Sequence, residues 1–181
     1  MENMNTKINN EDIPEFGLKR ENEERRDGGC AIVFDPGTQL YAVGKQLNNG
    51  VLRLFSGGVN ENEDTETGTL REVVEESGLH DFLYVEKTAE AFAHYHNSLR
   101  NVNRVTESTC FLVVLKNTKL VDIKHEEHEK FYLVWATAAE MLANWLARNE
   151  NNDYDHWVYF LKKSVNRAIE LGYDKTSLKI D

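Results

Sequence analysis

The stretch from Gly57 to Leu79, GGVNENEDTETGTLREVVEESGL, constrains the fold of this chain more than any other segment. It holds seven acidic side chains and one basic side chain, Arg71. The acidic positions are Glu61, Glu63, Asp64, Glu66, Glu72, Glu75 and Glu76. Like charges at this spacing repel one another. A chain that concentrates them must therefore hold something that neutralises them.

The spacing of apolar residues predicts a helix over roughly residues 65–77. Asp64 or Thr65 is the expected N-cap, and Gly78 is the expected C-terminal stop. The side chains expected to face the core are Leu70, Val73, Val74 and Ser77.

Three carboxylates share the opposite face of this helix, because Glu72, Glu75 and Glu76 stand at positions i, i+3 and i+4. Divalent cations would neutralise such a cluster, and its hard oxygen ligands suit Mg²⁺ or Mn²⁺. The pair Gly57–Gly58 ends the preceding strand, where a backbone without side chains can approach a metal or a phosphate closely. The alternative is an acidic helix face that is simply solvated.

The full stretch resembles the Nudix box, G-x5-E-x7-R-E-U-x-E-E-x-G-U, in which U is a bulky aliphatic residue. A second segment, WATAAEM (135–141), resembles the W-x4-E-hydrophobic element of the same family, so the likeness extends over roughly residues 29–145. Every fixed position of the box is filled at the required spacing, by Gly57, Glu63, Arg71, Glu72, Val73, Glu75, Glu76, Gly78 and Leu79.

The resemblance implies an α/β fold, an α/β/α sandwich with a mixed sheet, a central box helix and C-terminal helices. It also implies Mg²⁺-dependent (or Mn²⁺-dependent) hydrolysis of a nucleoside diphosphate that is linked to another group. By position, Arg71 and Glu63 would orient the helix carboxylates. The implied metal ligands are Glu72, Glu75 and Glu76, with a backbone carbonyl of Gly57 or Gly58.

The sequence departs from the common box at several places. Ser56 stands where the family often has proline, and Asn62 stands where it often has glycine. Gly68 replaces a helical alanine, at a cost of up to about 1 kcal/mol in helix propensity. The spacing also fits the first glycine of the pair instead of the second, so the loop is one residue shorter.

The box does not contain the general base, which in parts of the family comes from a late loop. The segment HEEHEK (125–130) precedes the WATAAEM element, and a solvated charged loop is the alternative for each of its residues. Its two histidines are three residues apart, which is not the spacing of an HExxH zinc helix. The candidate bases are Glu126, Glu127 and Glu129.

Four further side chains are candidates for substrate binding. Tyr95 lies 16 residues beyond Leu79, an offset that resembles the pattern of dinucleoside polyphosphate hydrolases, although a packed strand residue would look the same. Arginine suits phosphate geometry, and the candidates of this type, each of which can equally be a surface charge, are Arg53, Arg100 and Arg104.

We expect His94 and His96, on the same strand as Tyr95, to have a paired surface role or a core role more readily than a metal-binding role. They alternate on a likely strand and could face the site.

Beyond the box, the pattern mixes strands and helices. Residues 1–28 are polar and predict a disordered tail or an arm on a partner subunit, so a single domain is expected over 29–181. The C-terminal helix is expected over about 154–171, and another helix starts near Thr137. The expected strands are 30–34, 39–46, 51–55, 82–96, 105–116 and 131–135, with a loop at 97–103.

Composition narrows the function classes. The net charge of −10 argues against a general DNA- or RNA-binding surface. No apolar run approaches a membrane span of roughly 18 residues, the N-terminus is not a signal peptide, and a cytoplasmic location is expected.

Cys30 and Cys110 sit in apolar runs and predict buried free thiols. A homodimer is expected from family likeness only, and the alternative function is a non-catalytic nucleotide-binding regulatory module.

Overall fold

The computed structural model describes residues 13–97, 100–123 and 130–181. Within these residues, nine strands form one mixed sheet and three helices cover its faces. The strands are β1 (Glu15–Phe16), β2 (Glu24–Arg25), β3 (Gly28–Asp35), β4 (Leu40–Gln46), β5 (Leu52–Arg53), β6 (Phe55–Gly58), β7 (Phe82–Asn97), β8 (Val102–Leu115) and β9 (Phe131–Ala136). The helices are α1 (Thr65–Ser77), α2 (Ala138–Leu146) and α3 (Asp155–Glu170).

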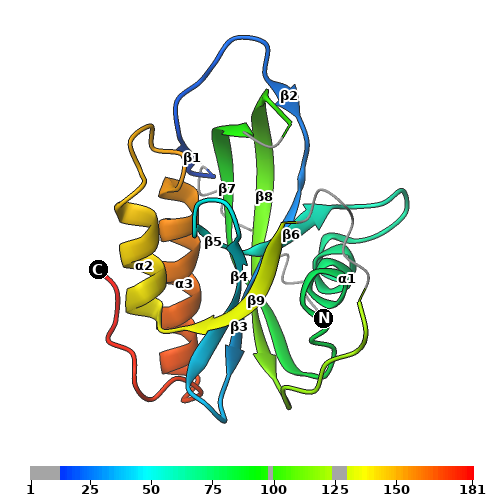
Figure 1. Cartoon of the computed structure of the whole chain (residues 1–181), viewed down its shortest axis with the longest axis vertical. Coiled ribbons are helices and arrows are strands. Elements are labelled where there is room, and N and C mark those ends of the chain that lie inside the picture. Colours follow the sequence, from blue (N-terminus) through cyan, green and yellow to red (C-terminus); the bar gives the residue numbers. More distant parts are fainter. Residues whose placement is uncertain (1–12, 98–99, 124–129) are drawn as a thin grey trace, which may run out of the picture.

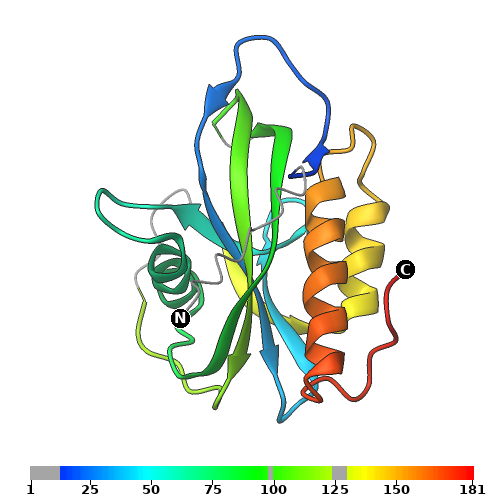
Figure 2. The ribbon, with the colours of Figure 1, turned by 180° about the vertical axis from the view of Figure 1, so that it is seen from behind.

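Helix α1 lies on one face of the sheet, and α2 and α3 lie together on the other (Figure 1). The view from behind shows the same three layers, with the long strands β7 and β8 between them (Figure 2). Most strand pairs are antiparallel, whereas β1–β7, β2–β8 and β3–β8 are parallel. The α/β sandwich with a mixed sheet is therefore confirmed.

The expected strand over 51–55 is wrong, because the chain divides there into two strands with different partners. Strand β5 pairs with β4, and β6 pairs with the first half of β3. The fully buried Leu54 separates them. Strand β3 pairs with β6 over 28–31 and with β4 over 33–35, so the sheet forks here and leaves the glycine pair at the open end.

Residues 13–28, part of the segment expected to be a disordered tail or an arm on a partner subunit, contain the short strands β1 and β2. Strand β2 and strand β3 run parallel to β8 in a single register, with Glu24 opposite Arg104 and Gly28 opposite Ser108. Strand β1 pairs with β7. The polar side chains of this segment hid the pairing, which uses backbone groups.

The helix boundaries follow from their caps. The Asp64 side chain accepts a hydrogen bond from Thr67 N at the start of α1, and Gly78 ends it with φ 80°. Thr137 and Glu140 form a capping box at the start of α2. Of the α1 side chains expected in the core, Val73 and Ser77 are buried and the other two are partly buried.

The core lies on both faces of the sheet. Trp145 and Leu161 pack in the layer under α2 and α3, and Val73 and Phe55 pack in the layer under α1. Both cysteines are buried free thiols, as expected. Within the described residues, no helix has the length and apolar character needed to cross a membrane.

Candidate active site

A cavity of about 820 Å³ opens where the sheet forks, and all the predicted site residues that the structure describes, apart from Glu63, line it. It runs from α1, past the glycine pair, to the ends of β7 and β8 and the start of α3. The predicted residues on its wall are Arg53, Gly57, Gly58, Arg71, Glu72, Glu75, Glu76, Tyr95, Arg100 and Arg104.

Arg71 holds the acidic stretch together. Its guanidinium donates to both carboxylate oxygens of Glu63, at 3.0 and 3.1 Å, and to the Gly58 carbonyl at 3.1 Å. It also donates to Glu72 at 2.7 Å and to Glu75 at 3.3 Å. Hydrogen bonds from Arg71 and from the Asn60 amide lower the pKa of the Glu63 carboxyl. Arg71 therefore connects Glu63 and the glycine pair to two helix carboxylates, and the orienting role expected of Arg71 and Glu63 stays a prediction.

Glu76 is the buried carboxylate of the three, with 4% of its surface exposed. It accepts from the Ser56 amide at 2.9 Å and pairs with the Arg53 guanidinium at 3.1 Å. The Arg53 guanidinium also lies 4.4 Å from the Phe131 ring centroid. Glu76 also lines the cavity.

Glu72 lies directly against the backbone of the glycine pair. A Cβ added at Gly57 would overlap the carboxyl group of Glu72, so only glycine allows this approach. Glu75, in contrast, is 59% exposed on the side-chain scale and is the most accessible of the three helix carboxylates.

These oxygens suit Mg²⁺ or Mn²⁺ by type, because hard cations prefer carboxylates and carbonyls. In the described part of the chain, however, no group of three His, Cys, Asp or Glu side chains is close enough to hold a metal ion. Arg71 stands between Glu72 and Glu75 and supplies the positive charge there. The carboxylate and carbonyl oxygens therefore fit a divalent cation in their chemistry. To bind one together, the carboxylates of Glu72, Glu75 and Glu76 must turn toward one another.

The departures from the common box have structural reasons. The Ser56 amide donates to Glu76, and a proline would lack that N–H group. Asn62 adopts φ 65°, a left-handed conformation that asparagine tolerates better than most residues. A Cβ added at Gly68 would lie 3.0 Å from Glu63 Oε2, so glycine makes room for the carboxylate that Arg71 holds.

The wall opposite α1 is cationic. Tyr95 stands across from Arg104 in the β7–β8 pair, and both side chains line the cavity. Burial raises the pKa of the Tyr95 phenol, while the charges of Arg104, Arg26 and Arg53 act in the opposite direction. Arg26, which sequence reasoning assigned to the tail, therefore belongs to the site.

Sequence reasoning also missed an aromatic wall at the start of α3, formed by Tyr154, His156 and Trp157. The His156 ring stacks on Tyr95 with 6.0 Å between centroids and is 7% exposed. Burial lowers the pKa of His156 to about 3, so its imidazole is neutral at pH 7. No local sequence motif marked the end of α3 that faces the cavity.

No hydrogen bond joins the His156 ring to another described residue. The His156 side chain lines the cavity.

The other histidines on β7 have different surroundings. His94 is buried and lies between two carboxylates, with Nε2 2.8 Å from Glu15 and Nδ1 2.9 Å from Glu23. His96 lines the cavity and bonds Asn103. The paired role expected of His94 is therefore what the structure shows. The candidate bases Glu126, Glu127 and Glu129, with His125 and His128, lie outside the described residues.

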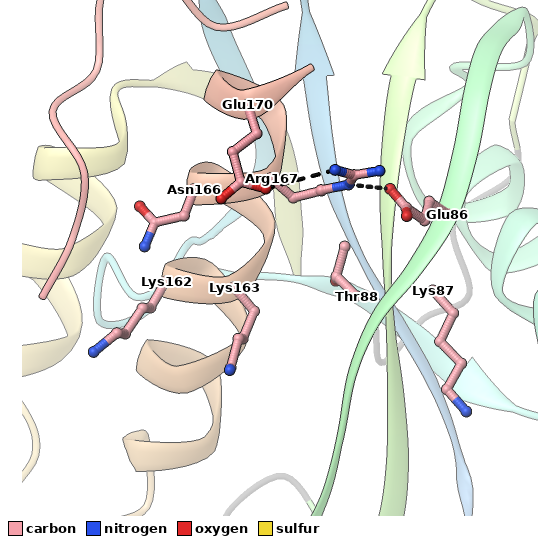
Figure 3. A pocket seen from close by; sticks show the side chains of 8 residues that line it. All are labelled: Glu86, Lys87, Thr88, Lys162, Lys163, Asn166, Arg167 and Glu170. Carbon is pink, nitrogen blue, oxygen red and sulfur yellow. Dashed lines mark hydrogen bonds and ion pairs between the residues drawn. The ribbon is translucent and has the colours of Figure 1, made fainter. Parts of the chain in front are cut away.

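A second, smaller pocket of about 330 Å³ lies between β7 and α3 (Figure 3). Arg167 on its wall pairs with Glu86 at 2.8 Å and with Glu170 at 3.5 Å, and Lys87 pairs with Glu90. Figure 3 shows Lys162 and Lys163 pointing away from the Arg167–Glu86 pair. Because its central guanidinium is already paired, this pocket is a poorer candidate for a charged ligand.

A family model described as the NUDIX domain matches residues 24–158. The match begins at Glu24, within the segment expected to be a tail, and includes β2. No curated protein sequence matches the chain significantly.

Solved structures share the fold at low sequence identity. The NUDIX domain of Shewanella oneidensis NrtR, solved with ADP ribose, is 15% identical with a TM-score of 0.53, over 82% of this chain and 90% of that one. MutT protein from Methanosarcina mazei Go1 is 14% identical with a TM-score of 0.51, over 82% and 98%. C. elegans Ap4A hydrolase is 11% identical with a TM-score of 0.50, over 80% and 98%.

Proposed function

Because this chain belongs to the Nudix family, we propose that it is a Mg²⁺- or Mn²⁺-dependent pyrophosphohydrolase. Its substrate would be a nucleoside diphosphate derivative, such as a nucleotide, a nucleotide sugar or a dinucleoside polyphosphate. One observation carries the proposal: Glu72, Glu75 and Glu76 line the same cavity as a cationic wall and an aromatic wall.

Each wall matches one part of such a substrate. Arginine guanidinium groups bind phosphate oxygens through paired hydrogen bonds, so we assign the diphosphate to the region of Arg53, Arg100 and Arg104. Aromatic rings stack on nucleobases, so we assign the nucleoside to Tyr95 and the start of α3. Neutral His156 can both donate and accept a hydrogen bond there.

The metal would be held by Glu72, Glu75 and Glu76 with a carbonyl of Gly57 or Gly58. When bound, it would offset the charge on the diphosphate oxygens and lower the pKa of an attacking water. We propose that a carboxylate then removes a proton from that water. Among the described residues, the exposed Glu75 is the candidate for this step. The candidates from the late loop are Glu126, Glu127 and Glu129.

The alternative is a non-catalytic module that binds a nucleotide and does not cleave it. It is favoured by Glu76, which is tied to Ser56 and Arg53, and by Arg71, which pairs with Glu72. The ADP ribose bound to the NrtR domain names one ligand class that such a module could take.

A turnover screen tests the proposal and separates the two functions. The protein would be incubated with Mg²⁺ or Mn²⁺ and with nucleotides, nucleotide sugars, dinucleoside polyphosphates and capped RNA, and the products would be resolved by chromatography. Cleavage of a diphosphate link in one class supports the hydrolase. The absence of cleavage, with a ligand that still raises the melting temperature, supports the binding module.

A further inference from the structure

Arg26 is a cation on the cavity wall whose side chain, like that of Arg100, has no partner within residues 13–97, 100–123 and 130–181. No hydrogen bond, ion pair or ring contact of its side chain joins it to another described residue. By contrast, Arg53 pairs with Glu76 at 3.1 Å, Arg104 pairs with Glu24 at 3.5 Å, and Arg71 pairs with three carboxylates. In a chain with a net charge of −10, an uncompensated guanidinium on a cavity wall is available to an anion.

The backbone of Arg26 is fixed by the sheet. Its amide donates to the Val105 carbonyl at 3.0 Å, and the next residue, Asp27, accepts from the Glu107 amide at 2.9 Å. Arg26 stands where β2 gives way to β3 in their shared register with β8. Side chains alternate along a strand, which places Arg26 on the cavity side and its neighbour Arg25 on the outer side.

The Arg26 side chain extends to the glycine pair. A Cβ added at Gly58 would lie 3.4 Å from Nε and 3.4 Å from Nη2 of Arg26. The Gly58 carbonyl accepts from Arg71, which holds Glu72 on the other side. The charge of Arg26 also acts on the Tyr95 phenol. Arg26 thus lies between the box carboxylates and the aromatic wall, where a diphosphate would join the metal to the nucleoside.

We propose that Arg26 is a phosphate-binding residue of the substrate site, supplied by the N-terminal segment. The proposal rests on the proposed function for its substrate class, a nucleoside bearing a diphosphate. A guanidinium offers a planar fork that matches phosphate oxygens. Arg26 therefore contributes to the binding of a ligand that carries phosphate and contributes nothing to the binding of the nucleoside alone.

Calorimetry on the full chain tests this assignment, with ADP and adenosine as probes. The measurements use a Glu75→Gln background with Mg²⁺, so that cleavage does not complicate the titration. Arg26→Ala should raise the Kd for ADP about tenfold or more, because a hydrogen bond to a charged group contributes roughly 1.5–3 kcal/mol. The Kd for adenosine should not change. The Kd of Arg26→Lys for ADP should lie between those of the parent and of Arg26→Ala, since lysine keeps the charge but lacks the planar fork of the guanidinium.

Arg25→Ala is the matched control, because Arg25 is the adjacent cation, does not line the cavity, and pairs with Asp27 and Glu107. It should leave the Kd for ADP unchanged. An Arg26→Ala variant that binds ADP as tightly as its parent would overturn the assignment. So would equal losses in the two alanine variants, or no ADP binding by the parent. Binding is measured here without turnover, so the two proposals can fail separately. If the wild type cleaves no substrate but its ADP affinity depends on Arg26, the proposed hydrolase function is contradicted and the phosphate-binding role of Arg26 is supported.

Discussion

At the residue scale, the site is a set of carboxylates held in place by arginines. Arg71 donates to Glu63, Glu72 and Glu75, and Arg53 donates to Glu76. This answers how seven acidic groups fit in one stretch: paired guanidinium groups offset part of their repulsion even without a cation.

Ser56 allows a direct test of the buried contact to Glu76. Ser56→Pro should lower the free energy of unfolding by about 1–3 kcal/mol, because it leaves a buried carboxylate oxygen without its donor. Ser56→Ala keeps the N–H group and should stay close to the wild type. Urea unfolding followed by circular dichroism measures both. Equal stability of the proline variant and the wild type would mean that this hydrogen bond contributes nothing.

Glu63 predicts a pH dependence of stability. Its pKa in the folded protein lies below the ordinary value of 4.5, mainly because of Arg71. The stabilising contribution is therefore fully present above pH 4.5 and is lost as the pH falls through the lower folded pKa. Unfolding of the wild type and Glu63→Gln should differ near neutral pH and converge in acid. A constant difference between them across the acid range would exclude this linkage.

The sequence revealed these box residues because a motif fixes their spacing within one helix and its loop. It did not reveal Arg26 or His156. Arg26 reaches the cavity through the pairing of β2 with β8, and His156 through the packing of α3, and neither contact leaves a local pattern.

At the element scale, the strands and helices that were expected from periodicity are present. The errors fall where the pairing between strands determines the structure. The run over 51–55 alternates like one strand, but β5 and β6 join different neighbours. The segment before β3 is polar, yet its backbone completes the edge of β8. The pairing register between two segments that are far apart in the chain leaves no pattern in the sequence of either segment.

His94 attaches the N-terminal segment to β7. Each ring nitrogen lies within hydrogen-bond distance of a carboxylate, of Glu15 or of Glu23. His94→Leu should loosen this segment and speed hydrogen exchange at the Arg26 amide, about tenfold for each 1.4 kcal/mol of attachment lost. Exchange mass spectrometry or NMR measures the effect.

The control is His96→Leu, because His96 lies two residues along the same strand and bonds Asn103 instead of the segment. It should leave the Arg26 amide protected. If the two leucine variants exchange alike, His94 does not hold the segment.

At the scale of the whole molecule, the three layers place α1 and α3 on opposite faces of one sheet, and the cavity crosses the fork between them. The sandwich could be expected from the box and from the strand pattern around it. The contact between the start of α3 and Tyr95 could not be predicted from the sequence, because it forms only when α2 and α3 pack on the second face of the sheet. The division into a tail over 1–28 and a single domain over 29–181 stays a prediction, although the family match from Glu24 favours an earlier start.

The charge of the molecule also acts at this scale. A net charge of −10 would repel the proposed anionic substrate, so the proposed function requires local attraction from the arginines on the cavity wall and from a bound cation. Removal of the metal should therefore abolish cleavage.

The most direct test of the central claim is the metal dependence of turnover with the best substrate of the screen. Three forms would be compared after treatment with EDTA and again after addition of Mg²⁺: the wild type, Glu75→Gln, and Glu66→Gln as a control on an exposed position of the same helix. We predict that EDTA stops cleavage, that Mg²⁺ restores it in the wild type and in Glu66→Gln, and that Glu75→Gln stays inactive while folded. Cleavage that continues in EDTA, or full activity of Glu75→Gln, would contradict the account.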